Sequence, residues 1–358
     1  MKSFILSIVM VAWAVGAETL DSIPGFDRPV PAPRWTEAAL VRLRDAPAAP
    51  FATDIAAANA ALSIPAAAPD RLDYEGRLAQ DPVRLVTVEA LADVSRVHAC
   101  HIAWLRGKDR RHADRAVAGI TAWALQYRIT GNAINEHKLS ALVAAWGSVR
   151  RFAVDPAAID GWVRALAEAQ VAAARRGGDT TRNNWQTKRL KLTALAGSAL
   201  DDGELRRWSA EGLAAFCSGA IATTGESEDF RTRDSLGYHC GMLVPLLEIA
   251  AALGQPEAYR RRGAAGGSPA DAVAFLLPYA KGEKTHAEWV RSTVELDRRR
   301  AASGDPHYRP GRLFAPAEAA TALTIASAFQ PKLAELAATL AGGGSADLLL
   351  LQARPWAP

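Results

Sequence analysis

The sequence has little cysteine and almost no charge excess, and each shortage excludes a class of protein. Three cysteines, Cys100, Cys217 and Cys240, stand in apolar, helix-like surroundings within 358 residues. So few cysteines do not build a disulfide scaffold, and we expect buried free thiols at these positions. The formal net charge is only +4, from 42 basic and 38 acidic residues. This small, dispersed excess argues against a nucleic acid partner but suits an anion held in a local basic groove.

The sequence also lacks the nucleophile and nucleotide motifs of common enzymes. It contains no GxSxG nucleophile elbow, no P-loop and no glycine-rich Rossmann turn after a strand. Serine hydrolase, nucleotide and dinucleotide chemistry therefore lose their usual sequence support. His98 and His101 have a spacing found in metal ligands, but no nearby carboxylate or HExxH pattern supports a metal. We expect neither a metal nor another cofactor.

Long apolar runs are also rare, and the clearest one lies at the N-terminus. Residues 1–17 read MKSFILSIVMVAWAVGA, with one lysine, an apolar stretch and small residues at the end. This is the layout of a secretory signal peptide, so we predict that it is removed from a periplasmic or secreted protein. No later stretch appears long and apolar enough in the sequence pattern to span a bilayer, so we expect no membrane partner after the signal is removed.

Strand patterns are scarce, whereas apolar residues recur at three- and four-residue spacing along most of the chain. This pattern predicts helices over 82–106, 112–130, 137–153, 156–175, 184–200, 203–222, 238–253, 269–280, 286–302 and 316–341. No fixed-period repeat marks a solenoid, so the succession favours an all-α fold, an (α/α) toroid or incomplete barrel of helical hairpins. We place this domain at 70–345, after an N-terminal extension at 18–69 and before a C-terminal tail at 346–358.

Four stretches contain polar and aromatic residues that helix amphipathicity alone does not explain. They are RVHACHIAWLRG at 96–107, RNNWQTKRLK at 182–191, FRTRDSLGYHCGMLVPLLE at 230–248 and THAEWVRSTVELDRRRAASGDPHYRPGRLF at 285–314. An asparagine at the start of a helix often caps it, which explains one of the adjacent pair at 183 and 184 but not both. The other stretches also have simpler explanations, namely half-buried polar tips and a basic helix end.

Two of these stretches together resemble a known family. RNNWQTKRLKLTALAGSALDD at 182–202, followed by RDSLGYHCGMLVPLLEIAAAL at 233–253, is similar to the paired core motifs of the alginate lyase superfamily of polysaccharide lyases. NEHKLSALVAAWGSVRRFAVD at 135–155 and THAEWVRSTVELDRRRAASGDPHY at 285–308 fit the same pattern. The resemblance covers most of residues 80–330. It implies an (α/α) toroid that cleaves a uronate polymer by β-elimination.

The chain departs from the best-known members of the family at two positions. Those members have a histidine after the asparagine pair, and they end a YHNY motif with the tyrosine that serves as catalytic acid and base. Here the two positions hold Trp185 and Gly241, whereas Tyr238 and His239 are retained. The sequence thus resembles branches of the superfamily in which an asparagine, a histidine and a tyrosine from a later segment act.

The resemblance implies which residues neutralise the substrate. The C5 hydrogen of a uronate is very weakly acidic until its neighbouring carboxylate is neutralised, because its removal places a second negative charge beside the first. Amide donors or a cation can neutralise the carboxylate by binding most strongly in the enolate-like transition state. We expect Asn183, together with His239, to take this role, with Asn184 as the alternate. Trp185 is then a wall or a platform for a sugar ring, or simply part of the core.

A tyrosine beside cations can both take the C5 proton and protonate the leaving oxygen. We favour Tyr308, with His239 and Arg300, over Tyr238, because adjacent helical residues point about 100° apart and Tyr238 need not share a site with His239. Further candidates for substrate binding are Arg231, Arg233 and His101.

Two other functions are compatible with the sequence. A glycoside hydrolase on the same architecture needs two opposed carboxylates, for which Asp229, Asp234 and Asp297 are the nearest candidates. A protein that only binds an acidic polysaccharide could keep the groove without the chemistry. In each case the partner we expect is a polysaccharide, which is acidic for the lyase and for the binding protein.

Overall fold

The computed structural model of the protein describes residues 28–343 and 346–353. Within these residues the chain contains helices and no β-strand, and two isolated β-bridges join Ile221 to Ser227 and Ala287 to Leu313. The signal peptide predicted at 1–17 lies outside the described residues. The α-helices are α1 (Glu37–Asp45), α2 (Ala52–Ala61), α3 (Pro82–Ala90), α4 (Ala92–Gly107), α5 (Arg110–Gln126), α6 (Ala133–Glu136), α7 (Ser140–Val149), α8 (Pro156–Arg175), α9 (Asn184–Leu200), α10 (Gly203–Ala220), α11 (Glu228–Arg233), α12 (Leu236–Leu253), α13 (Pro269–Ala280), α14 (Glu295–Ala302), α15 (Ala320–Ser327), α16 (Ala334–Leu340) and α17 (Ala346–Gln352).

Local sequence explains where the longest helices begin and end. The side chain of Asp155 accepts hydrogen bonds from the backbone of the first turn of α8, and Pro156 occupies the first helical position, where its missing N–H costs nothing. At the other end of a helix, Gly254 adopts a φ of 65° and stops α12. Helices α8, α9 and α13 have the bounds that the sequence predicts.

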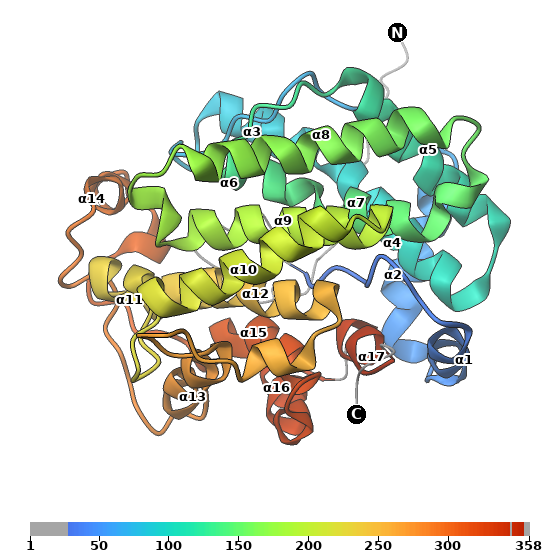
Figure 1. The fold of residues 1–358 in the computed structure, drawn as a ribbon. Coiled ribbons are helices and arrows are strands. Elements are labelled where there is room, and N and C mark those ends of the chain that lie inside the picture. Colours follow the sequence, from blue (N-terminus) through green and yellow to red (C-terminus); the bar gives the residue numbers. More distant parts are fainter. Residues whose placement is uncertain (1–27, 344–345, 354–358) are drawn as a thin grey trace, which may run out of the picture.

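The helices pair into hairpins that curl into a toroid (Figure 1). Consecutive helices pack against each other across short connections, as α4 does with α5 and α9 with α10. Helix α9 also contacts α7, α8 and α12, so it stands near the centre of the assembly. This architecture is the all-α (α/α) toroid that the sequence predicts.

Helices α9 and α12 run in the same direction. Lys191 of α9 forms an ion pair with Glu248 of α12, and further along both helices Ser198 donates a hydrogen bond to the carbonyl of Ala252. Both contacts pair a later residue of α9 with a later residue of α12, so the N-terminal ends of the two helices lie at the same end of the toroid. The two motifs noted in the sequence therefore meet at one end of the toroid, where α14 also lies (Figure 1).

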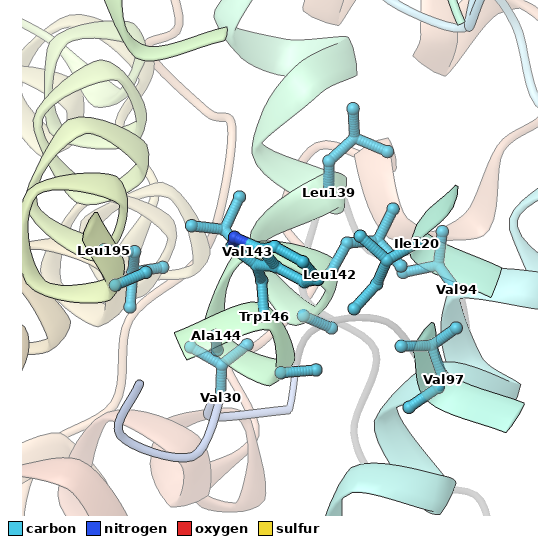
Figure 2. Packing of buried hydrophobic residues seen from close by; sticks show 14 of the residues in the cluster. Val30, Val94, Val97, Ile120, Leu139, Leu142, Val143, Ala144, Trp146 and Leu195 are labelled. Atoms are coloured by element: carbon cyan, nitrogen blue, oxygen red, sulfur yellow. The ribbon is translucent and has the colours of Figure 1, made fainter. Parts of the chain in front are cut away.

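Apolar side chains fill the toroid in two large clusters. The first is centred on helices α4, α5, α7 and α8, and the second on α12, α13 and α15. Figure 2 shows Trp146 and Leu142 of α7 within the first cluster, with Leu195 of α9 on one side and Val30 of the N-terminal segment close by. Burying one such leucine stabilises the fold by about 1.5–3 kcal/mol.

The two ends of the described chain meet on the body of the toroid. Arg28 forms ion pairs with Asp54 of α2 at 2.5 Å and with Asp347 of α17 at 2.8 Å. The backbone N–H of Val30 donates to Glu248 at 3.1 Å, deep in the interior. The N-terminal extension and the C-terminal tail are thus tied to the helical body, and the proposed domain limits stay predictions.

One predicted helix, over 286–302, is only half present. Residues 286–294 form an irregular strap, and α14 begins at Glu295. The backbone N–H of Glu288 donates to the carbonyl of Arg312 at 2.8 Å, and Gly311 donates back to Glu288 at 2.9 Å. These hydrogen bonds to a distant segment replace the backbone bonds of a helix. A local sequence pattern does not predict them. The stretch 316–341 is likewise divided, into 3₁₀ turns with α15 and α16.

Two further expectations concern buried apolar residues. Cys100, Cys217 and Cys240 are buried free thiols, as predicted. Helix α12 is long and apolar enough to cross a membrane by length and composition, contrary to the expectation from sequence. Since 83% of its window is buried inside the protein, α12 has the placement of a core helix.

Candidate active site

The two adjacent asparagines at the start of α9 occupy different structural positions. The side-chain oxygen of Asn183 accepts a hydrogen bond from the backbone N–H of Trp185 at 3.0 Å, so Asn183 is the N-cap. Asn184 is the first helical residue and is only 3% exposed. Capping therefore explains Asn183 and leaves the role of Asn184 to be explained.

Asn184 shares one face of α9 with two lysines. Lys188 and Lys191 follow it by four and seven positions, a spacing that places side chains on the same side of a helix, and both are nearly fully buried. Lys191 is paired with Glu248 at 2.6 Å. Through Lys191 this polar face of α9 reaches α12, which carries Glu248.

The 3₁₀ turn η2 (His137–Leu139), which leads into α7, extends this polar face. Lys138 is buried, and its Nζ lies 5.9 Å from the centre of the Tyr74 ring. Burial, followed by the charges of Lys138, Lys188 and Lys191, holds the pKa of His137 well below its usual 6.5. The positive charges of three lysines, from η2 and α9, thus act on the side chain of His137 and make this part of the interior electropositive.

Two tyrosines and an arginine from distant segments form a second cluster. The hydroxyl oxygens of Tyr238, in α12, and Tyr308, in the 3₁₀ turn η6 (Pro306–Tyr308), lie 3.4 Å apart. Nη1 of Arg300, on α14, donates hydrogen bonds to both hydroxyls, at 3.3 Å for Tyr238 and at shorter range for Tyr308. All three side chains are more than 90% buried. Of the predicted catalytic residues, the structure brings these three together.

Further aromatic and charged side chains enclose the tyrosines. Trp289 packs edge-on against Tyr238, with ring centres 5.6 Å apart, and at a tilt of 31° against Tyr308, with ring centres 4.8 Å apart. The guanidinium of Arg233 lies 3.9 Å from the centre of the Tyr238 ring and is ion-paired with Asp297. Arg233 therefore belongs to this cluster, as a cation that covers the face of one tyrosine.

His239 points away from the tyrosines. Its Nδ1 lies 3.0 Å from the hydroxyl oxygen of Ser227, and its Nε2 lies 3.0 Å from the carbonyl oxygen of Ala272. The ring is fully buried against Phe275, and burial lowers the pKa of His239 to about 4. A neutral imidazole with both nitrogens engaged by the protein is placed for packing between α12 and α13, and the structure does not bring it to Tyr308 or Arg300.

The other predicted binding residues lie outside the tyrosine cluster. Arg231 is half-exposed on α11 and pairs with Glu228 at 2.8 Å. Trp185 is half-buried and packs against the first apolar cluster. His101 is buried on α4, with its Nε2 2.9 Å from the hydroxyl of Ser148 on α7.

Of the three carboxylates considered for hydrolysis, Asp234 and Asp297 are engaged in ion pairs, and Asp229 is buried on α11. Asp234 adopts a φ of 52° at the end of α11 and is paired with Arg291 at 2.8 Å. Hydrogen bonds from Arg291 hold the pKa of Asp234 below its usual value, although burial acts in the opposite direction as the largest single influence. Asp297 is paired with Arg233. Within the described residues, no group of three or more metal-binding side chains is assembled.

Sequence reasoning missed several residues of the site. Lys188 and Lys191 stand within the quoted motif, and their spacing from Asn184 was the signal that could have found them. Trp289 and Lys138 carry no such local signal, because their neighbours come from distant segments. Gly241 lies one turn after Tyr238, and a Cβ there would meet no atom within 4 Å, so the position that holds a tyrosine in the best-known alginate lyases is open space here.

Comparison with known proteins identifies the family that this chain resembles. The sequence model of the family described as alginate lyase matches residues 42–286. This range includes the asparagine pair and Tyr238, and it ends before Arg300 and Tyr308. No curated protein sequence matches the chain.

Solved structures of similar fold are alginate lyases. One from Bacteroides ovatus is 16% identical, and the match covers 86% of this chain and 94% of that chain with a TM-score of 0.60. Alginate lyase A1-III from Sphingomonas species A1 is 17% identical, with 73% and 82% covered and a TM-score of 0.57. A variant of A1-III complexed with a tetrasaccharide matches at 17% identity and a TM-score of 0.55, with 73% and 81% covered. At these identities the likeness shows a shared fold.

Proposed function

Because the chain belongs to the alginate lyase family and is a polysaccharide lyase, we propose that it cleaves a uronate-containing polysaccharide by β-elimination. The reaction takes place at the tyrosine cluster, formed by Tyr238, Tyr308 and Arg300. The observation that carries the proposal is the meeting of Tyr238, Tyr308 and Arg300 at the end of the toroid where α9 begins. Proton abstraction, proton donation and charge neutralisation are the three tasks of the reaction. The site offers side chains for each of them.

Neutralisation of the substrate carboxylate is assigned to Asn184. Its neighbour Asn183 is engaged as the helix cap, and Asn184 begins the buried face that continues through Lys188. An amide N–H donates a hydrogen bond to a carboxylate without adding charge of its own, and a nearby lysine lowers the energy of the enolate that follows. Lys188 and Lys138 supply the positive potential that draws an acidic polymer to the site.

Proton transfer is assigned to Tyr308. Arg300 donates to its hydroxyl, and a guanidinium beside a phenol favours the phenolate, which can take the C5 proton. The same hydroxyl, once protonated, can return that proton to the O4 oxygen as the glycosidic bond breaks. Tyr238 is the alternate, since its hydroxyl also contacts Arg300. A later tyrosine in this role fits the open space at Gly241.

Export and substrate charge are part of the same proposal. The N-terminal sequence MKSFILSIVMVAWAVGA has the layout of a signal peptide, and we propose a periplasmic or secreted enzyme that acts on an acidic polymer. The tetrasaccharide bound by a relative of similar fold supports a carbohydrate substrate. Neither a nucleic acid nor a membrane partner enters the proposal.

The test is incubation of the mature protein with polymers of mannuronate, guluronate and glucuronate while the ultraviolet absorbance of new carbon–carbon double bonds is followed. A lyase creates that chromophore with each cut. Release of reducing ends without the chromophore would indicate a glycoside hydrolase, and binding without either product would indicate a carbohydrate-binding protein.

A further inference from the structure

Two adjacent residues of the strap, Glu288 and Trp289, connect the elements that carry the two tyrosines. Tyr238 lies in the first turn of α12, and Tyr308 closes η6. The strap residues lie between the two in sequence, outside any helix. They also lie beyond the part of the chain that the family model matches, residues 42–286.

Glu288 binds the first turn of α12. Its Oε2 accepts a hydrogen bond from the hydroxyl of Ser235 at 2.6 Å and from the backbone N–H of Gly237 at 3.3 Å, while Oε1 accepts from the N–H of Leu236 at 2.8 Å. The first N–H groups of a helix have no partner within the helix, and a carboxylate there also interacts favourably with the helix dipole. The strap is therefore fastened to the turn that presents Tyr238.

Each of these neighbours donates to Glu288, and the side chains of Arg312 and His286 lie slightly farther from the carboxylate. Nη2 of Arg312 lies 3.7 Å from Oε2, and Nε2 of His286 lies 3.8 Å from Oε1. Glu288 is fully buried, and burial raises its pKa. A glutamine would turn an NH₂ group toward one of these donors, so the site is built for a carboxylate.

Trp289 makes the second connection. Its backbone N–H donates to the carbonyl of Asp234 at 2.9 Å, just before α12, and its indole Nε1 donates to the carbonyl of His307 at 2.8 Å, in η6. Its ring packs against both Tyr238 and Tyr308. One side chain thus touches the two tyrosines and fixes the backbone beside one of them.

The backbone of Trp289 is strained. Its φ is 69°, in the left-handed region that bulky residues seldom adopt. Such a conformation persists only where surrounding contacts enforce it, and strain of this kind is concentrated at functional sites. The bonds of Glu288 on one side and of the indole on the other are contacts of that kind.

We propose that Glu288 is a positioning residue: by fastening the strap to α12 it sets Trp289 between the tyrosines and so keeps both hydroxyls on Arg300. The proposal rests on the lyase function proposed above. It assigns no contact with substrate to Glu288. Glu288 instead determines where the hydroxyl groups of the two tyrosines lie.

The test compares Glu288→Gln with Glu136→Gln, a matched control. Glu136 is also fully buried and also accepts backbone hydrogen bonds, from Thr130 and Gly131, but the helix that donates to it is α8, through Gln170, and not α12. For each variant we would measure kcat and KM on a polyuronate, the thermal unfolding midpoint, and the pH dependence of kcat/KM.

We expect Glu288→Gln to lower kcat by about 10- to 100-fold with a KM within about threefold of the wild type, since misplacing reacting groups by about 1 Å has this effect. The pH at which kcat/KM rises, as the catalytic tyrosine ionises, should move to a higher value. A phenol that has lost contact with Arg300 ionises less readily. Glu136→Gln should lower the unfolding midpoint without moving the pH profile.

A second variant covers the case in which Glu288→Gln does not fold. Trp289→Phe keeps a ring between the tyrosines but loses the bond to His307, and it should also lower kcat and shift the pH profile upward. The inference is overturned if folded Glu288→Gln keeps kcat within about twofold of the wild type, or if both carboxylate variants lose kcat equally with an unchanged profile. If Glu288→Gln does not fold, an unchanged kcat and pH profile in Trp289→Phe overturns it. If the wild type itself forms no unsaturated product from any polyuronate, the proposed function fails instead.

Discussion

The hydroxyl oxygens of Tyr238 and Tyr308 lie 3.4 Å apart, although 70 positions separate the two residues in the chain. Arg300 donates a hydrogen bond to each of them. A cation that faces two phenols favours the loss of a proton from either one, and it also allows a proton to pass between them. The roles of the two tyrosines are therefore distinguished by substitution rather than by their distance from Arg300.

Tyr308→Phe should lower kcat by about 10²–10⁴-fold, the usual worth of a general acid or base. The phenyl ring keeps its packing against Trp289, so folding and polymer binding should be preserved. Tyr238→Phe should be milder. Formation of unsaturated product measures turnover, and retention of labelled polymer measures binding. The opposite order of the two variants would assign the acid and base role to Tyr238.

Asn184→Ala should lower kcat by about 10²–10³-fold while KM changes little, because the lost hydrogen bond is strongest in the transition state. Asn183→Ala, which removes the cap, should instead lower the free energy of unfolding by about 1 kcal/mol and keep most of the activity. Steady-state kinetics and urea unfolding of both variants separate the two effects. A larger kcat loss in Asn183→Ala would move the neutralising role to that residue.

Lys188→Gln should raise KM for a polyuronate by about tenfold at low salt, and the difference from wild type should shrink as salt screens the attraction. Lys281→Gln is the control, because Lys281 is exposed and its Nζ lies 3.5 Å from Oε1 of Glu283 on the surface. KM is measured across a series of sodium chloride concentrations. Equal KM values for the two variants at low salt would remove Lys188 from substrate binding.

His239 should make the protein less stable in acid. Burial lowers its pKa from 6.5 to about 4 in the folded state, so below pH 6.5 the unfolded chain binds a proton that the folded chain does not. The stabilisation is therefore present above pH 6.5 and is lost as the pH falls toward about 4. His239→Gln should lose less unfolding free energy than the wild type between pH 7 and pH 5. His98 and His101 are present in both proteins and contribute equally, and an identical loss in the two would contradict the assignment.

Local signals made much of the fold predictable. The start of α8 follows from Asp155 and Pro156, whose capping and fixed φ act within one turn of the chain. The start of α9 at Asn184 was predicted in the same way, and so was the need for one asparagine to cap it. The helical period and the scarcity of strand patterns sufficed for the fold class.

Part of the candidate site was also visible in the sequence. The motifs point to Tyr238, Tyr308 and Arg300, and the structure brings these three together. The motifs also point to His239, but its ring faces Ser227 and Ala272 instead. Adjacent residues on a helix point in different directions, and only the packing of α12 against its neighbours decides which direction leads to the site.

The sequence by itself determined the helices, the capped start of α9 and the residue types from which the site is built, because these depend on contacts within a few positions. The tertiary structure determined the irregular conformation of the strap, residues 286–294. Helical periodicity predicted a continuous helix over 286–302, but Glu288 gains backbone bonds to distant Arg312 and Trp289 adopts a φ of 69° between two tyrosines. Those bonds exist only once α12 and η6 are in place, and their combined strength outweighs the helical preference of the segment.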